Sequence, residues 1–119
     1  MIIIYGARQT GKTTLVKKIL ADYSKISSKY INCDEEDFRR LLTEANNSTQ
    51  LKQIIGESKL IVLDEEQRVV NIGLKLKLLV DNFPNQQIIA TGSSSFELAQ
   101  NIIEPLQVET FSFGFILFP

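Results

Sequence analysis

The residues most able to do chemistry form a glycine-bounded loop near the start of the chain. Residues 6–13 follow the pattern G-x-x-x-x-G-K-[ST] and read Gly6, Ala7, Arg8, Gln9, Thr10, Gly11, Lys12 and Thr13. Glycine lets such a loop turn tightly, so that successive backbone N–H groups and the start of a following helix face phosphate oxygens. In this pattern the lysine reaches the β- and γ-phosphates and the last hydroxyl binds Mg²⁺. We therefore predict a nucleoside-triphosphate site that extends through Thr14, with Lys12 also catalytic.

A glycine-rich turn that matches this pattern by chance is the alternative. A phosphate loop needs a strand before it and a helix after it, and both are indicated. Residues 1–5 form a short, continuous apolar run, and apolar side chains recur at helical spacing after the loop, at Leu15, Val16, Ile19 and Leu20. This context favours phosphate binding.

An acidic pair follows a second apolar run, residues 60–63. Asp64 and Glu65 come directly after that run, and ligands collect at the carboxyl edge of open parallel sheets. We expect Asp64 to hold Mg²⁺ through water and Glu65 to orient or deprotonate an attacking water. The alternative for the pair is a strand that runs into a solvated acidic turn. For Glu66, a solvent-facing position is an equal possibility.

A row of small polar side chains, residues 91–95, ends a further apolar run. Thr91 and Ser93 are the better candidates there to contact the γ-phosphate or the attacking water, and so to sense which nucleotide is bound. The alternative is helix capping, because serine favours the N-cap position and a short helix is expected at residues 96–100.

Alternating strands and helices would bring these groups together. Short apolar runs predict strands at residues 1–5, 29–33, 60–63 and 87–90. Helical spacing predicts one helix at about residues 11–22 and a second that begins after its N-cap, Asp34. A short third helix is expected around residues 51–55, and a fourth begins at residue 72 and ends before Pro84. The alternation implies a parallel sheet with right-handed crossovers, in one domain over residues 1–119.

Composition narrows the possible chemistry further. The 119-residue chain has no histidine, one cysteine (Cys33) and a formal net charge of −1. Histidine-based catalytic triads, intrachain disulfides and cysteine metal clusters are therefore excluded, and any metal chemistry must use oxygen ligands, which favours Mg²⁺. Neither nucleic acid nor a membrane is indicated as a partner, and a cytoplasmic location is expected.

Three segments together resemble the AAA-type predicted ATPases of bacteria and archaea, within the ASCE branch of P-loop NTPases. They are residues 5–15, residues 63–67 and residues 88–95, in the order and spacing of that family. The resemblance implies ATP and Mg²⁺ as ligands and carries the roles above to Lys12, Thr13, Asp64 and Glu65. It also implies a three-layer α/β fold, in which helices cover both faces of a parallel sheet of about five strands in the order 5-1-4-3-2.

The sequence departs from the family pattern at two places. Glu66 stands where the family usually has an apolar residue, and Gln107, Val108 and Glu109 stand where a glycine-arginine pair is usual. No arginine follows Arg68. A cation for the γ-phosphate would then come from Arg8, Arg68 or another protein chain.

The resemblance predicts an ATPase that drives a conformational change in a partner or in a C-terminal domain that the family usually carries. We expect the chain to stop before that domain, with residues 111–118 of its apolar end as a fifth strand beside the first. Two alternatives stay open. One is a nucleotide-dependent switch with negligible turnover, and the other is a small-molecule kinase, which the arginine-poor second half disfavours.

Overall fold

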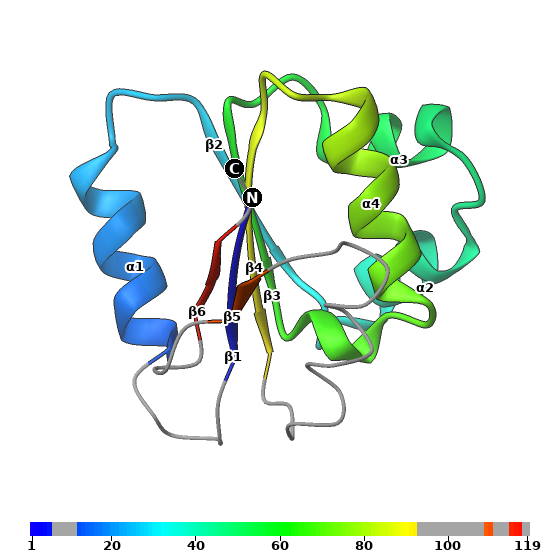
Figure 1. The fold of residues 1–119 in the computed structure, drawn as a ribbon, viewed down its shortest axis with the longest axis horizontal. Coiled ribbons are helices and arrows are strands. Elements are labelled where there is room, and N and C mark those ends of the chain that lie inside the picture. Colours follow the sequence, from blue (N-terminus) through cyan, green and yellow to red (C-terminus); the bar gives the residue numbers. More distant parts are fainter. Residues whose placement is uncertain (6–11, 93–108, 111–114, 118–119) are drawn as a thin grey trace.

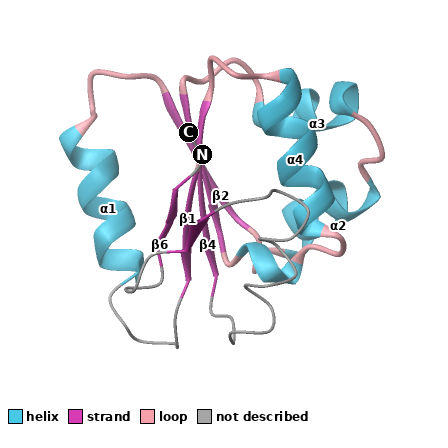
Figure 2. Ribbon diagram, in the orientation of Figure 1, coloured by secondary structure: helices cyan, strands magenta, loops and turns pink. Residues whose placement is uncertain are grey.

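A computed structural model of the chain describes residues 1–5, 12–92, 109–110 and 115–117. Strands and helices alternate through most of these residues (Figures 1 and 2). In chain order the elements are β1 (Ile2–Tyr5), α1 (Lys12–Asp22), β2 (Ser28–Asn32), α2 (Glu36–Glu44), α3 (Ser48–Ile55), β3 (Leu60–Asp64), the 3₁₀ turn η1 (Glu66–Arg68), α4 (Ile72–Asn82), β4 (Gln87–Gly92), β5 (Glu109–Thr110) and β6 (Phe115–Leu117).

The strands form one sheet in the order β2-β3-β4-β1-β6-β5. The first four strands in that order are mutually parallel, and their pairing register includes Tyr30 with Val62, Asn32 with Asp64, and Tyr5 with Gly92. The predicted α/β class and the order 1-4-3-2 are therefore confirmed. The polar ends of β1, β3 and β4 consequently lie at the same edge of the sheet.

The prediction of about five parallel strands is wrong in its count, because the parallel part has four. The apolar terminal segment does lie beside the first strand, but β6 pairs with β1 in the antiparallel direction. A parallel partner would need a long crossover connection, whereas β5 and β6 are joined through residues 111–114 alone and pair as antiparallel neighbours. The short connection therefore explains the antiparallel pairing of β6 with β5.

Helices cover both faces of the sheet, as predicted. Of the described helices, α1 lies on one face, and α2, α3 and α4 lie on the other (Figure 1). Side chains alternate between the two faces along each strand. Ile61, Leu63 and Ala90 belong to the core under α4, and Val62 and Ile89 to the core under α1. Every residue of β3 is buried, in keeping with its continuous apolar run.

Two polar residues satisfy backbone groups at the ends of helices on the α4 face. The Nζ of Lys75, in α4, donates to the carbonyl oxygens of Thr43 and Ala45 at 2.5 and 2.9 Å. It thereby satisfies carbonyl groups at the end of α2 that the helix itself leaves unpaired. The side chain of Asn47 caps α3 and accepts from the backbone N–H of Gln50 at 2.9 Å. None of the helices in the described residues is long and apolar enough to cross a membrane.

Candidate functional site

The site begins where β1 leads into α1. Residues 6–11, which carry the candidates Gly6, Ala7, Arg8, Gln9, Thr10 and Gly11, lie outside the described residues, and so does Ser93. Lys12 and Thr13 are the first two residues of α1, and Thr14 is exposed on its first turn. The predicted strand before the glycine pattern and the predicted helix after it are therefore both present, at the edge where β3 and β4 end (Figure 1).

Asp64 is the last residue of β3, and its carboxylate is held from both neighbouring strands. The hydroxyl of Tyr30, on β2, donates to Oδ2, and the hydroxyl of Thr91, on β4, donates to Oδ1. Asp64 is only 5% exposed, so these donors compensate for the loss of water around a buried charge. The two hydrogen bonds fix the carboxylate at the sheet edge that faces the start of α1.

Thr91, one of the two sensor candidates, lies at the centre of this arrangement. It is fully buried. Besides donating to Asp64, its Oγ1 accepts from the backbone N–H of Glu65 at 3.3 Å. Its hydroxyl therefore organises the end of β3, which is a different contact from the predicted one to a phosphate or a water.

Tyr30 was missed by the sequence interpretation. It lies within the strand predicted at residues 29–33, but no local pattern marks it as part of a site. The usable signal is long-range: once β2 pairs with β3 in parallel, side-chain alternation places Tyr30 on the same face as Asp64. Burial, and then the hydrogen bond to Asp64, raise the pKa of the Tyr30 hydroxyl.

Glu65 follows Asp64 in a left-handed backbone conformation, with φ 56° and ψ 45°. A non-glycine residue pays roughly 1–2 kcal/mol for that conformation, and such strain gathers at functional sites. The side-chain amide of Gln67 donates to Oε2 of Glu65 at 2.6 Å. The two carboxylates of the pair are therefore held by different parts of the structure. Side chains of β2 and β4 hold Asp64, whereas Gln67, two residues along the chain, holds Glu65.

Glu66 is buried, so the solvent-facing possibility is wrong for this residue. Its side chain is fully buried, and neither carboxyl oxygen has a hydrogen-bond partner among the residues that the structure describes. Burial, and then the charge of Glu65, raise its pKa to about 8. The turn η1 carries the side chain inward, because residues after a left-handed turn no longer continue the alternation of β3.

Gly92 is packed against this turn. A Cβ at position 92 would lie 2.8 Å from Oε1 of Gln67 and 3.0 Å from Oε1 of Glu66. Both distances are shorter than ordinary packing permits, so the end of β4 approaches η1 through a residue without a side chain. The ends of β3 and β4 are thus in contact on both faces of the sheet.

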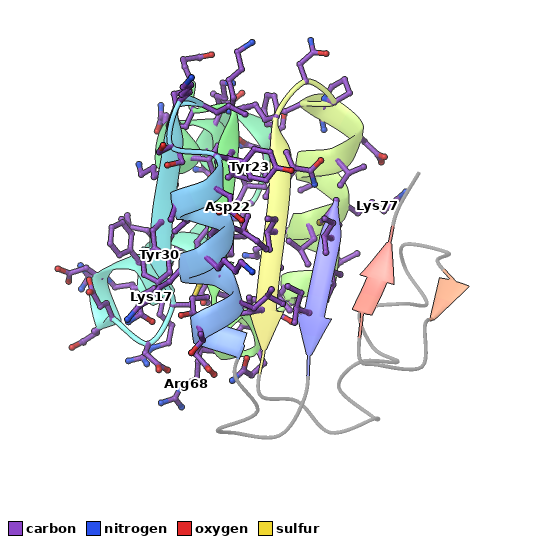
Figure 3. The ribbon with its side chains drawn as sticks, turned by 90° about the vertical axis from the view of Figure 1, so that its left-hand side faces the viewer. Lys17, Asp22, Tyr23, Tyr30, Arg68 and Lys77 are labelled. Carbon is purple, nitrogen blue, oxygen red and sulfur yellow. The ribbon has the colours of Figure 1, made fainter. Side chains whose placement is uncertain are left out.

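Arg68, one of the candidate cations, is paired with Asp34. Its Nε lies 2.9 Å from Oδ1 of Asp34, and both side chains are about half exposed. Asp34 was predicted to cap α2, but the cap position is occupied by Glu35, and the Asp34 carboxylate binds Arg68 instead. Figure 3 labels Arg68 near the edge where the strands end. An exposed pair of this kind contributes less than about 1 kcal/mol, so Arg68 exchanges partners at little cost.

The donor chemistry fits Mg²⁺, which the glycine pattern implies as a companion of the nucleotide. Mg²⁺ usually keeps several waters and is bound by one or two carboxylates together with phosphate oxygens. Asp64 supplies such a carboxylate, and Thr13 lies in the first turn of α1. Within the described ranges, no three acidic or sulfur ligands gather into a ready-made metal cluster.

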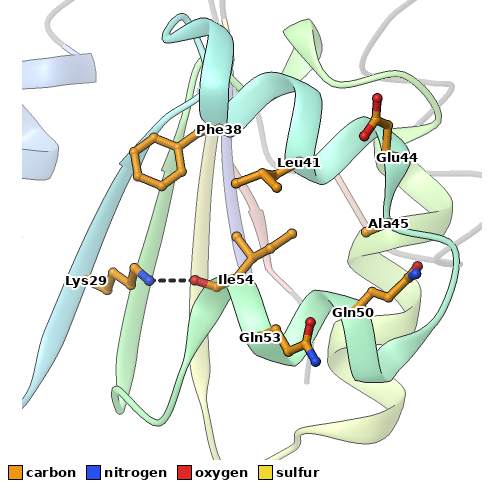
Figure 4. A pocket seen from close by; sticks show the side chains of 8 residues that line it. All are labelled: Lys29, Phe38, Leu41, Glu44, Ala45, Gln50, Gln53 and Ile54. Carbon is orange, nitrogen blue, oxygen red and sulfur yellow. Dashed lines mark hydrogen bonds between the residues drawn. The ribbon is translucent and has the colours of Figure 1, made fainter.

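Two hollows lie away from this edge. One, of about 420 Å³, is lined by side chains of β2, α2 and α3, including Phe38, Leu41 and Gln53 (Figure 4), and Lys29 donates to the carbonyl of Ile54 at 2.5 Å beside it. The other, of about 560 Å³, includes Ile2, Tyr23 and Asn85, at the opposite end of the strands. Neither includes Asp64, Glu65 or Thr91.

Comparison with known proteins agrees with this geometry. A family model described as "AAA domain" matches residues 1–117. An uncharacterized protein of Methanocaldococcus jannaschii is 33% identical over 106 residues, which cover 88% of this chain and 24% of that protein. The chain therefore spans about a quarter of the length of the curated relative that it matches.

Proposed function

Because this chain belongs to the AAA domain family, we propose that it binds ATP with Mg²⁺ and hydrolyses it. The observation that carries the proposal is the Asp64 carboxylate, fixed by Tyr30 and Thr91 at the sheet edge where the glycine loop joins α1. A carboxylate in this place would suit a metal ion that accompanies the nucleotide. Membership of the family supports nucleotide binding, and we propose hydrolysis in addition.

Each residue then has a distinct role. The backbone N–H groups of residues 6–11 would bind the phosphates, Lys12 would neutralise charge on the β- and γ-phosphates, and the Thr13 hydroxyl and Asp64 would hold the metal. Mg²⁺, when bound, stabilises the charge that develops on the phosphate oxygens. Glu65 accepts the proton of a water whose oxygen attacks the γ-phosphorus, as the bond to the β-γ bridging oxygen breaks and ADP leaves.

The geometry of the Asp64–Glu65 turn supports hydrolysis over phosphate transfer to a small molecule. Glu65 adopts a strained conformation, and Gln67 holds its carboxylate at 2.6 Å. A carboxylate held beside the phosphate site serves water activation. We further propose that turnover drives a conformational change in a partner or in a further domain, which also supplies an arginine to the γ-phosphate.

A nucleotide-dependent switch with negligible turnover is the second candidate. The observation in its favour is that no arginine follows Arg68 in the sequence. An arginine at the γ-phosphate is worth about 10³–10⁵ in rate in enzymes of this type. A chain without one would bind ATP well and hydrolyse it slowly.

ATP affinity and phosphate release, measured on the wild type, Lys12→Ala and Glu65→Gln, test the proposal. We expect Lys12→Ala to lose binding, and Glu65→Gln to retain binding while losing turnover. Lys17→Ala is the matched control, because Lys17 is an exposed lysine of the same helix.

Each result favours a different function. Unchanged nucleotide affinity in Lys12→Ala would refute nucleotide binding at the glycine loop. Tight binding without phosphate release in the wild type would favour the switch. Transfer of phosphate to an added small molecule, with none to water, would favour a kinase.

A further inference from the structure

Among the described residues, the hydroxyl of Tyr30 donates to the Asp64 carboxylate although Tyr30 belongs to none of the motifs. Tyr30 lies on β2 and contacts Oδ2 of Asp64 across the sheet. We propose that Tyr30 is a positioning residue for hydrated Mg²⁺, acting through Asp64, so that the gain in nucleotide affinity on adding Mg²⁺ depends on its hydroxyl. The inference rests on the proposed function, since it requires Asp64 to serve a Mg²⁺-nucleotide.

The pairing register places Tyr30 where it can reach Asp64. Tyr30 pairs with Val62, and Asn32, two residues further on, pairs with Asp64. Tyr30 and Asp64 are therefore diagonal neighbours on one face of the sheet, a separation of about 7–8 Å that a long aromatic side chain spans. The hydroxyl, at the end of the ring, is the part that arrives at the carboxylate.

The exposure of Tyr30 argues that its ring is not held for packing alone. Tyr30 remains 43% exposed, on the face that α1 covers (Figure 3), whereas an aromatic side chain that serves a core buries most of its ring. The part of the side chain that is held in place is the hydroxyl, through its hydrogen bond to Asp64.

Two donors on opposite oxygens leave Asp64 able to serve a metal-bound water. An ionised carboxylate has about four acceptor positions. Tyr30 occupies one on Oδ2 and Thr91 one on Oδ1, so acceptor positions remain on both oxygens. Because the carboxylate is held at both ends, its orientation is set before the ion arrives. Partners that orient a ligand in this way are typically worth about 10–100-fold in metal affinity or activity.

Tyr30→Phe keeps the ring and removes only the hydroxyl. Affinity for a fluorescent ATP analogue would be measured in EDTA and across a Mg²⁺ titration. We expect affinity in EDTA to stay within about twofold of the wild type, and the Mg²⁺ concentration for half-maximal gain in affinity to rise about tenfold. Tyr23→Phe is the matched control, since Tyr23 lies just beyond the other end of α1 and is 54% exposed.

A double-mutant cycle tests whether Tyr30 acts through Asp64. In an Asp64→Ala background, Tyr30→Phe should change the Mg²⁺ dependence no further, because the group that it orients is gone. An additional loss of similar size in that background would show an independent contribution and would overturn the inference.

The remaining outcomes separate this inference from the proposed function. If the wild type gains affinity on adding Mg²⁺ and Tyr30→Phe gains it at the same concentration, Tyr30 has no positioning role, while the proposed function stands. If Tyr30→Phe loses affinity equally in EDTA and in Mg²⁺ and melts at a lower temperature, its role is structural and the inference fails. If the wild type binds no nucleotide, the proposed function and the inference fail together.

Discussion

The hydroxyl of Thr91 donates to Oδ1 of Asp64, and its oxygen, Oγ1, also accepts from the backbone N–H of Glu65. One buried side chain on β4 therefore binds the carboxylate of Asp64, the last residue of β3, and the backbone N–H of Glu65, which follows it. The contact is possible because the parallel pairing of the two strands, which includes Leu63 with Ala90, brings the following residues to the same level of the sheet.

Thr91→Val removes this hydroxyl at nearly constant volume. We expect it to lower the free energy of unfolding by about 1–3 kcal/mol, because Asp64 and the Glu65 N–H lose a buried partner. Phosphate release should fall about 10–100-fold. Urea denaturation and a phosphate assay check the two effects. Thr91→Ser, which keeps a hydroxyl, should lie close to the wild type in both, and a valine variant as active as the serine variant would contradict the proposed role.

Glu66 should make stability depend on pH in the metal-free protein. Its pKa in the folded state is raised to about 8 from an ordinary value of 4.5, so the folded state binds more protons than the unfolded state between these values. Its stabilising contribution is fully present below pH 4.5 and is lost as pH rises through 8. The slope for one proton is at most about 1.4 kcal/mol per pH unit.

Urea denaturation in EDTA from pH 5 to 8.5 measures this slope, and Glu66→Gln should flatten it. Glu57→Gln is the control, because the Glu57 side chain is 88% exposed. The thiol of Cys33, whose pKa burial raises to about 12, titrates above this window. An equal slope in the wild type and in Glu66→Gln would refute the assignment to Glu66.

Gly92→Ala should disturb the contact between β4 and the turn η1. The added Cβ would lie 2.8 Å from Gln67 Oε1 and 3.0 Å from Glu66 Oε1. We expect a loss of about 1–3 kcal/mol in the free energy of unfolding, as for other overpacked sites. In a Glu66→Ala background part of that loss should disappear, because one of the two obstacles is gone. Additive losses in thermal or urea denaturation would contradict a direct contact.

Lys75→Met should destabilise the fold without changing nucleotide affinity. The substitution removes the donor to the carbonyls of Thr43 and Ala45, and hydrogen bonds from a charged group contribute about 1.5–3 kcal/mol. Lys77→Met is the control, because Lys77 makes an exposed pair with Asp81 at 3.2 Å on the same helix. A similar, small loss in both variants would mean that the buried carbonyl contacts contribute little.

Local patterns in the sequence were sufficient for much of this protein. The glycine loop, the acidic pair after a buried strand, and the alternation of strands and helices are set by neighbouring residues, because backbone turns and side-chain periodicity act over a few positions. The order of the four parallel strands came from the resemblance to a known family. The roles of Lys12, Thr13, Asp64 and Glu65 stay predictions that follow from the same patterns.

Tertiary structure alone decided which groups meet at Asp64. Tyr30 and Thr91 reach its carboxylate because β2 and β4 pair with β3 in one particular register, and a shift of one residue would turn either side chain to the other face. Glu66 is buried because the left-handed turn at Glu65 directs it inward. The antiparallel pairing of β6 with β1 likewise joins two ends of the chain that are far apart in sequence. Each of these contacts joins residues or strands whose relation is set by pairing and turn geometry, which local periodicity does not encode.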